Sequence, residues 1–300
     1  MLKIAFHPLY KHQLPAGHRF PMEKYELIPE QLLYEGSIQQ SNLFEPDKLG
    51  RETILLTHKK DYLDRLLSLT LTEKEIRRIG FPLSQQLVDR CLHIGQGTLD
   101  CTRYASEFGI SMNIAGGTHH AHSDFGEGFC LLNDQAMAAN YLIHSSKAKQ
   151  ILIVDLDVHQ GNGTAEIFRN EPRVFTFSMH GEKNFPARKD KSDLDIALPD
   201  GANDDLYLGI LQSNLATIMQ NLKPDFVFYN AGVDVLADDR LGRLAMSIAG
   251  CKMRDQIVLA ACKSGNIPLV ISMGGGYSKK LSTLIEAHAN TYRVAQEMYF

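Results

Sequence analysis

The sequence predicts an α/β fold in which a mostly parallel sheet is covered by helices on both faces. Short apolar runs rich in β-branched residues alternate along the chain with longer segments of helical period. The apolar runs are continuous, as expected of strands that are buried on both faces. No stretch rich in Pro, Gly or Ser divides the 300 residues, so we expect one domain over residues 1–300.

The expected strands are the apolar runs themselves, such as ILIV, VFTF, FVFY and LVIS. Runs of four to eight residues without helical period are typical of buried strands. In chain order they are Lys3–Phe6, Thr53–Thr57, Met112–Ala115, Ile151–Asp155, Val174–Ser178, Phe226–Tyr229 and Pro268–Ser272.

The helical segments lie between these runs. In the segment from Asp204 to Leu222, apolar side chains recur every three or four residues, and Pro224 follows its end. The other expected helices run from about Leu83 to Glu107, from near Asn133, from Ser247 to Lys263, and from Lys280 to about Gln296.

Composition and charge exclude several classes of protein. Hydrophobic residues make up 44% and charged residues 22%, which suits a soluble globular protein and excludes general disorder. The net charge is −4 and no basic block occurs, so we expect no nucleic-acid ligand. No run of 18 apolar residues occurs, so we expect no membrane-spanning segment.

Cysteine usage and the N-terminal residues indicate the compartment. The 5 cysteines are scattered and form no C-x-x-C pair, which argues against a disulfide framework and favours a reducing environment. The first residues, MLKIAFHPLYKH, lack the features of a signal peptide. We therefore expect a cytoplasmic protein, whose oligomeric state the sequence leaves open.

Polar side chains gather where the expected strands end. GGTHHAH (116–122), DLDVHQGNG (155–163), NAGVD (230–234) and MGGGY (273–277) each follow or end a strand. In open parallel sheets, binding sites lie at the carboxyl ends of the strands. The sequence therefore predicts a functional site at this edge of the sheet.

Asp157 and His159 are candidate metal ligands. On an extended segment, residues two apart point to the same side, so both side chains can reach one ion. Asp234, at the end of another strand, is the natural third ligand of a catalytic divalent metal with an open position. A strand-end turn residue and an ordinary loop histidine are the alternative interpretation of the first two, and the neighbouring His and Tyr residues favour the metal.

His119 and His120 are candidate acid/base groups. Asp155 shares the parity of Asp157, so its carboxylate can hold one of these imidazoles and raise its basicity. Tyr277 follows three glycines and can donate a hydrogen bond to a developing oxyanion. A surface His pair and an ordinary loop aromatic are the alternatives, whereas a nucleotide loop lacks its lysine here.

At these motifs the sequence resembles the histone deacetylase superfamily. The resemblance covers nearly the whole chain in family order, and HRFPM (18–22) and HQGNG (159–163) are most similar to the class IV-like bacterial branch. It implies a three-layer α/β/α sandwich of the arginase/deacetylase type and hydrolysis of acyl-amine bonds. The matching text is GGTHHAHSDFGEGFCLLND (116–134), DLDVHQGNGT (155–164), VFTFSMHGEKNFP (174–186), NAGVDVLADDRLG (230–242) and SMGGGY (272–277). The upstream segments HRFPMEKYELI (18–28), THKKDYLDRL (57–66) and RRIGFPLSQQLV (77–88) also match.

The resemblance also implies residue roles. The expected ligands of a catalytic Zn²⁺ are Asp157, His159 and Asp234, and the expected catalytic residues are His119, His120, Tyr277 and Asp155, the partner of His119. The residues matching the acyl-lysine tunnel are Gly128, Phe129, Phe185, Leu241 and Gly275. Those matching a structural K⁺ site, largely through backbone oxygens, are Asp155, Asp157, His159, Ser178 and Met179.

Two departures from the family pattern stand out. Asn162 replaces the carboxylate that holds the second histidine in some members, so the pKa of His120 should differ from theirs. The aspartate that grips the substrate backbone at the tunnel rim of many eukaryotic members has no clear counterpart, which leaves the mode of peptide binding open.

The resemblance implies a zinc-dependent enzyme that removes acetyl or longer acyl groups from lysine side chains. Metal-activated water, paired histidines and a tyrosine for the oxyanion would supply the chemistry. A deacetylase of small amines such as acetylpolyamines and a non-catalytic acyl-lysine-binding protein remain as alternatives. A two-metal ureohydrolase is disfavoured, because Gln160-Gly161-Asn162 offers no carboxylate for a second ion. The acyl chain length and the identity of the divalent ion stay open.

Overall fold

A computed structural model describes residues 1–300 and contains one eight-stranded sheet in which all paired strands are parallel. The strand order is β2-β1-β3-β8-β7-β4-β5-β6. The bounds are β1 Lys3–Ala5, β2 Leu43–Phe44, β3 Ile110–Asn113, β4 Ile151–Asp155, β5 Val174–Gly181, β6 Leu194–Leu198, β7 Phe226–Asn230 and β8 Leu269–Ser272. The predicted parallel sheet is confirmed.

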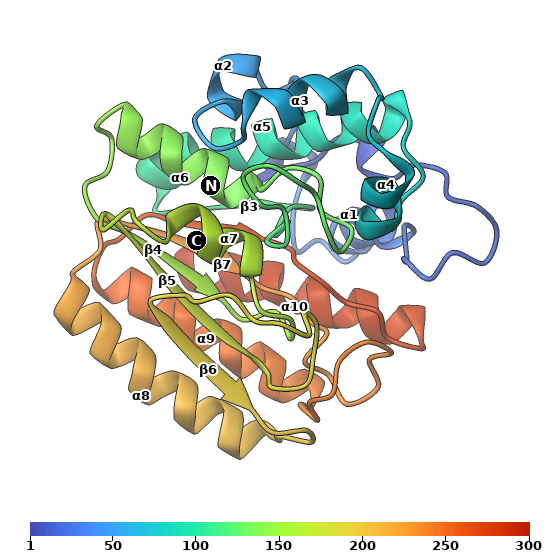
Figure 1. Ribbon diagram of the computed structural model, residues 1–300. Coiled ribbons are helices and arrows are strands. Elements are labelled where there is room, and N and C mark those ends of the chain that lie inside the picture. The colour runs from blue at the N-terminus through green and yellow to red at the C-terminus, as the bar shows by residue number, and fades with distance from the viewer.

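Helices cover both faces of the sheet, so the molecule has three layers (Figure 1). One outer layer holds α5 (Gln85–Phe108) and α6 (Asp134–His144). The other holds α8 (Asp204–Leu222), α9 (Ile248–Ser264) and α10 (Leu281–Tyr299), with α1 (Lys24–Tyr34) against α10. The shorter helices are α2 Arg51–Ile54, α3 Lys60–Leu67, α4 Glu73–Ile79 and α7 Asn162–Phe168.

The two-residue period of the strands divides the core between these layers. Ile151 and Ile153 of β4 pack in the apolar cluster that includes residues of α5 and α6. Leu152 and Val154 point the other way, into the cluster that contains the buried faces of α8, α9 and α10. A strand buried on both faces therefore has no polar alternation, as the sequence indicated.

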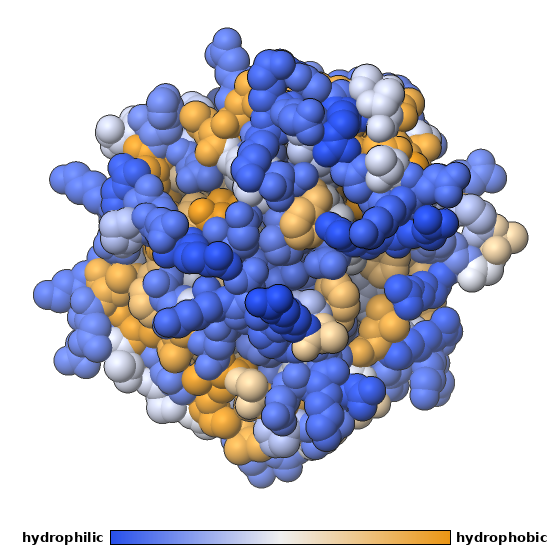
Figure 2. Space-filling model, viewed as in Figure 1, coloured by the Kyte–Doolittle hydropathy of each residue, from blue (hydrophilic) through white to orange (hydrophobic).

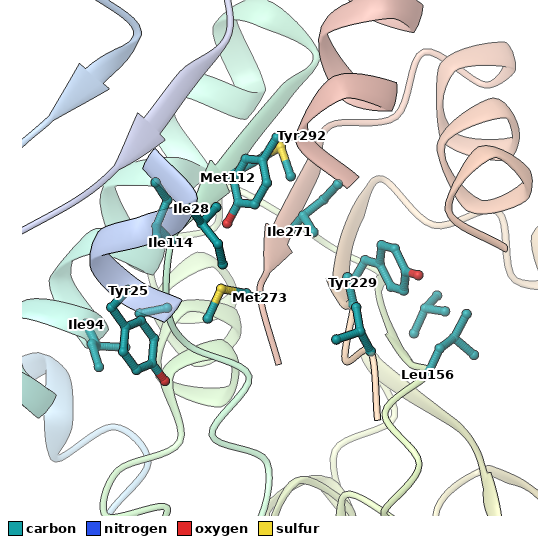
Figure 3. Close-up of a cluster of buried hydrophobic side chains, with 14 of the residues drawn as sticks. Tyr25, Ile28, Ile94, Met112, Ile114, Leu156, Tyr229, Ile271, Met273 and Tyr292 are labelled. Carbon is teal, nitrogen blue, oxygen red and sulfur yellow. The ribbon is translucent and has the colours of Figure 1, made fainter. Parts of the chain in front are cut away.

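Long-range contacts join the first helix to the centre of the sheet. Figure 3 shows Ile28 of α1 close to Met112 and Ile114 and near Tyr292 of α10, and Tyr25 beside Ile94. The Tyr292 hydroxyl donates a 3.0 Å hydrogen bond to the carbonyl of Asn113.

In the view of Figure 2 the surface is mostly hydrophilic, and its hydrophobic residues form small, separate groups. None of the helices combines the length and apolarity that a membrane crossing requires.

The expected strand Thr53–Thr57 is wrong. These residues end α2 and form a turn, closed by the hydrogen bond from the His58 N–H to the Ile54 carbonyl. Only Ile54 of the apolar triplet reaches the core, whereas Leu55 is 38% exposed. A five-residue apolar run without a Gly or Pro boundary does not distinguish a strand from a short helix.

The two edge strands were not predicted, for different reasons. β2 has only 2 residues, which is too short to form a pattern. β6 reads LDIAL, with polar and half-buried side chains, because only one neighbour pairs with it. The predicted helices are confirmed, and their bounds shift by only a few residues.

Candidate active site

The candidate metal ligands meet at the carboxyl ends of β4 and β7. Asp157 and His159 lie in the loop that follows β4, and Asp234 lies in the loop that follows β7. All three are buried, and their ligand atoms lie within 4.8 Å of one another. His159 Nδ1 is 2.9 Å from Asp157 Oδ1 and 3.2 Å from Asp234 Oδ2.

The chemistry of this cluster fits a divalent cation. The backbone N–H of Gly275 donates a 2.8 Å hydrogen bond to Asp157 Oδ2. The backbone N–H of Val158 donates a 2.8 Å hydrogen bond to Asp234 Oδ1. Asp234 Oδ2 is buried without a hydrogen-bond partner. Burial and the nearby Asp157 charge raise the pKa of Asp234 to about 7. Two buried carboxylates and an imidazole are a donor set that Zn²⁺ accepts, and a cation would remove their repulsion.

The first candidate acid/base histidine is paired with a carboxylate. His119 Nδ1 lies 2.6 Å from Asp155 Oδ2, and Asn230 Nδ2 donates a 3.0 Å bond to the other oxygen of Asp155. Burial lowers the pKa of His119, but the charges of Asp155 and Asp157 outweigh it and raise the pKa to about 9. The two carboxylates thus favour the protonated ring.

The second histidine has a neutral partner. His120 Nδ1 lies 2.7 Å from Asn162 Oδ1, and Asn162 Nδ2 donates a 3.0 Å bond to Glu127 Oε2. Burial, followed by the positive charges of His119 and His159, holds the pKa of His120 well below its usual value. The two rings lie side by side, with centroids 4.1 Å apart, but a carboxylate faces His119 and a neutral amide faces His120.

Tyr277 stands between two cavities. Its side chain lines an open cavity of about 510 Å³ and a small inner cavity of about 50 Å³. Its backbone N–H donates a 2.6 Å bond to Asp239 Oδ2, which fixes the loop after β8. Burial, with the charges of Asp234 and Asp157, holds the pKa of Tyr277 well above 10, so the hydroxyl keeps its proton.

The expected tunnel residues surround these cavities. Phe185 and Leu241 line the open cavity, Gly275 lines the inner one, and Gly128 and Phe129 line both. The Phe185 ring stands edge-on to His120, with centroids 4.9 Å apart. Gly128 has a φ of +54°, and a Cβ there would meet the His120 ring at 2.7 Å.

The residues expected at a K⁺ site lie on adjacent strands. Asp155 of β4 is in register with Ser178 of β5, and Met179 follows Ser178 in β5. Asp157 and His159 continue from the end of β4, and all five residues are buried.

Arg254 of α9 supports the ligand loops, and the sequence analysis missed it. It is fully buried, and its guanidinium donates bonds to the carbonyls of Leu156 at 3.2 Å and Gly232 at 2.5 Å. Each of these residues lies within two positions of a candidate ligand. The signal in the sequence was an Arg-Asp pair inside an otherwise apolar helix.

Lys24 of α1 is a second missed residue. It is fully buried, donates a 3.3 Å bond to the Gly274 carbonyl, and holds its ammonium 5.8 Å from the centroid of the Tyr277 ring. Burial, partly offset by Asp234 and Asp157, lowers the pKa of Lys24 to about 8. A lysine in a short helical pattern gives no sign of such burial.

Comparison with known proteins agrees with this geometry. A model of the histone deacetylase domain matches residues 18–292. An uncharacterized protein of Picosynechococcus sp. is 45% identical over 296 residues, which cover 99% of both chains. Histone deacetylase 2 of Arabidopsis thaliana is 30% identical over 279 residues, which cover 89% of this chain and 72% of that protein.

Solved structures share the fold. The crystal structure of an HDAC homolog from Aquifex aeolicus matches with a TM-score of 0.82 at 23% identity, over 98% of this chain and 82% of that chain. The HD domain of HDA15 matches with a TM-score of 0.83 at 20% identity, over 99% of this chain and 88% of that one. The predicted arginase/deacetylase-like sandwich is confirmed, and the chain belongs to the histone deacetylase family.

Proposed function

We propose that this protein is a zinc-dependent deacylase that hydrolyses the amide bond of an acylated lysine side chain. The observation that carries the proposal is the contrast between His119 and His120. His119 Nδ1 faces the carboxylate of Asp155, whereas His120 Nδ1 faces the neutral amide of Asn162, and the two rings lie 4.1 Å apart beside the candidate metal ligands. Adjacent groups whose pKa values are driven apart are the usual sign of an acid and a base.

His120 serves as the base. The Asn162 oxygen accepts the Nδ1 proton, which leaves Nε2 free to take a proton from the attacking water. The water oxygen then bonds to the carbonyl carbon, and the carbonyl becomes an oxyanion. A Zn²⁺ ion held by Asp157, His159 and Asp234 would supply Lewis acidity and lower the pKa of water.

Tyr277 and the histidines complete the reaction. The Tyr277 hydroxyl, which stays protonated, donates a hydrogen bond to the oxyanion. The C–N bond breaks as the leaving amine takes from His120 the proton that this ring removed from the water. The products are a carboxylic acid and a free lysine amine. His119 keeps its proton through Asp155 and adds positive charge near the developing anion.

The inner cavity supports a short acyl group. Its volume of about 50 Å³ accommodates an acetyl group, whereas a long fatty chain needs several times that space. Relatives named Histone deacetylase 2 and Histone deacetylase 9 in Arabidopsis thaliana agree with acetyl removal. We further propose that backbone oxygens near Asp155 and Ser178 hold a structural K⁺ ion.

The test is mass-spectrometric turnover of lysine peptides carrying acetyl to long-chain acyl groups, together with acetylpolyamines. The zinc-loaded protein is assayed before and after chelation, and again after zinc is restored. Zinc-dependent release of acetate from peptides supports the proposal. Selective cleavage of acetylpolyamines would replace it with a small-amine deacetylase, and peptide binding without cleavage by any loaded preparation would indicate an acyl-lysine-binding protein.

A further inference from the structure

Positive side chains surround the mouth of the open cavity. Among its lining residues, five are cationic, and we call them the cationic rim: Arg19, Arg77, Arg78, Lys183 and Arg243. All five are exposed. Glu127 is the one carboxylate that lines the same cavity. The chain as a whole has a net charge of −4, so this positive charge is local to the mouth.

Nearby carboxylates do not neutralise the cationic rim. Lys183 and Arg243 share a single carboxylate, Asp200, at 3.7 Å and 3.4 Å. Glu127 already accepts a hydrogen bond from Asn162. Arg77 pairs with Glu73 at 3.5 Å, but both side chains are largely exposed, and such pairs are weak.

The remaining two arginines have aromatic neighbours in place of acids. The Arg19 guanidinium lies 5.1 Å from the centroid of Phe129, and that of Arg78 lies 4.5 Å from the centroid of Phe125. Neither makes an ion pair within the chain. A cation that stacks on a ring keeps its N–H donors available for an anion. The mouth therefore has a surplus of positive charge and of free donors.

A hollow beside the mouth has the same character. It shares Arg19 and Tyr277 with the open cavity and adds Arg240 and Lys279, against one carboxylate, Glu23. Positive charge around a concave site raises the local concentration of anions and repels cations. A polyamine or a lysine among basic residues would meet this repulsion at the mouth.

We propose that the cationic rim selects acylated lysines that lie in acidic protein segments, with Asp or Glu on both sides of the lysine. This inference rests on the proposed deacylase function. The five cations come from four separate parts of the chain, around residues 19, 77–78, 183 and 243, and all five line the same cavity. A small anion would contact one of them, whereas an acidic segment that crosses the mouth meets several.

The test compares three acetyl-lysine peptides of equal length whose flanking residues are acidic, neutral or basic. We measure kcat/KM for each, and in parallel the Kd of the labelled peptides, at about 20 mM and about 300 mM salt. The acidic peptide should exceed the basic one by about tenfold or more in kcat/KM and in affinity at low salt. The difference should lie in KM and should shrink at high salt.

Two variants locate the effect. The double substitution Arg78→Gln and Arg243→Gln should lower the acidic-to-basic ratio several-fold. Arg173→Gln, at an exposed ion pair just before β5, removes a charge away from the mouth and should keep the wild-type ratio. Equal values for the three peptides, or a preference for the basic one, would overturn the proposal. Peptide turnover without charge preference would leave the deacylase function standing, and the affinities decide on the cationic rim even if no peptide is cleaved.

Discussion

The Nδ1 atom of His120 lies 2.7 Å from the side-chain oxygen of Asn162. The amide is oriented by Glu127, which accepts a 3.0 Å bond from the Asn162 nitrogen, so only the amide oxygen can face the ring. His120 must then donate from Nδ1, and Nε2 is left as an acceptor. An amide offers no charge to offset the burial of an imidazolium, which explains why the pKa of His120 lies well below that of an exposed histidine.

Replacing Asn162 with Asp should shift the pH dependence of the enzyme. A carboxylate beside His120 stabilises the imidazolium and raises its pKa. Because a base works only when unprotonated, activity falls as the pH drops below that pKa. The acidic limb of kcat/KM should therefore move upward by about one pH unit or more in Asn162→Asp. Asn221→Asp adds the same charge at an exposed position of α8 and should leave the limb in place. Superimposable limbs in all three proteins would refute the role of Asn162.

Removing the Tyr277 hydroxyl should slow the chemical step and spare metal binding. One preorganised oxyanion donor contributes about 3 kcal/mol, so Tyr277→Phe should lower kcat by roughly a hundredfold or more. The zinc content of the variant should stay at the wild-type level, because Tyr277 contacts none of the three candidate ligands by a hydrogen bond. Tyr34→Phe, on a side chain that is 95% exposed, is the control. Near-normal turnover of Tyr277→Phe would contradict the proposed donor.

Strand geometry was sufficient to predict that the candidate metal ligands meet at one edge of the sheet. Asp155, Asp157 and His159 share one parity at the end of a continuous apolar strand, and parallel strands bring their carboxyl ends to one edge. Arg254 and Lys24 could not be found this way. Their roles depend on carbonyl groups that are distant in the chain and that approach only after the layers have packed.

The fold shows the same division. Central strands such as Ile151–Asp155 are buried on both faces and give a clear apolar signal. In the edge strand β6 only one of the five side chains is fully buried, so its sequence shows no continuous apolar run. Thr53–Thr57 gave a false strand because its apolar residues serve a short helix at the periphery, where tertiary packing overrides the preference of β-branched side chains.

Gly275 is required by space at the ligand cluster. A Cβ at this position would collide with the carboxylate oxygens of Asp157 and Asp234. Gly275→Ala should therefore displace the ligands, reduce zinc affinity and activity together, and lower the free energy of unfolding by about 1–3 kcal/mol. Gly209 of α8 has nothing within 4 Å of its virtual Cβ. Gly209→Ala should keep full activity and gain about 0.5–1 kcal/mol in stability. If Gly275→Ala bound zinc and stayed active, the loop after β8 would be able to move and accommodate the methyl group, and the spatial argument would be wrong.

Arg254 should control the affinity for the metal from outside the ligand set. Its guanidinium joins the carbonyls of Leu156 and Gly232, which flank the two candidate carboxylate ligands. Lysine keeps the charge, but its single nitrogen cannot bind these two carbonyls and Asp255 together, as Nη1, Nε and Nη2 of the guanidinium do. Arg254→Lys should weaken zinc binding about 10- to 100-fold in a chelator competition, because groups that orient ligands contribute this much. Arg173→Lys, on an exposed ion pair, should bind zinc like the wild type. Unchanged affinity in a folded Arg254→Lys protein would restrict Arg254 to a packing role.

His58 should make the fold sensitive to acid. Its ring is buried and bridges two segments: Nδ1 lies 3.0 Å from the His122 carbonyl, and Nε2 accepts a 3.0 Å bond from the N–H of Asn133 at the start of α6. This pair of partners requires the neutral ring with its proton on Nδ1. Burial, only partly opposed by the backbone carbonyls, lowers the pKa of His58 from 6.5 to about 4.

The sign of the effect follows from proton uptake. Between pH 6.5 and 4 the unfolded chain binds a proton at His58, whereas the folded protein does not, so acid favours unfolding. This group alone should remove up to about 3 kcal/mol of the free energy of unfolding across that interval. His58→Gln should be less stable at pH 7 by about 1–3 kcal/mol, yet should lose less on acidification. His144→Gln, at an exposed histidine of α6, should retain the wild-type slope. Urea unfolding at pH 7 and at pH 4.5 measures both quantities. Equal slopes for His58→Gln and the wild type would mean that the folded protein binds a proton at His58 as readily as the unfolded chain does.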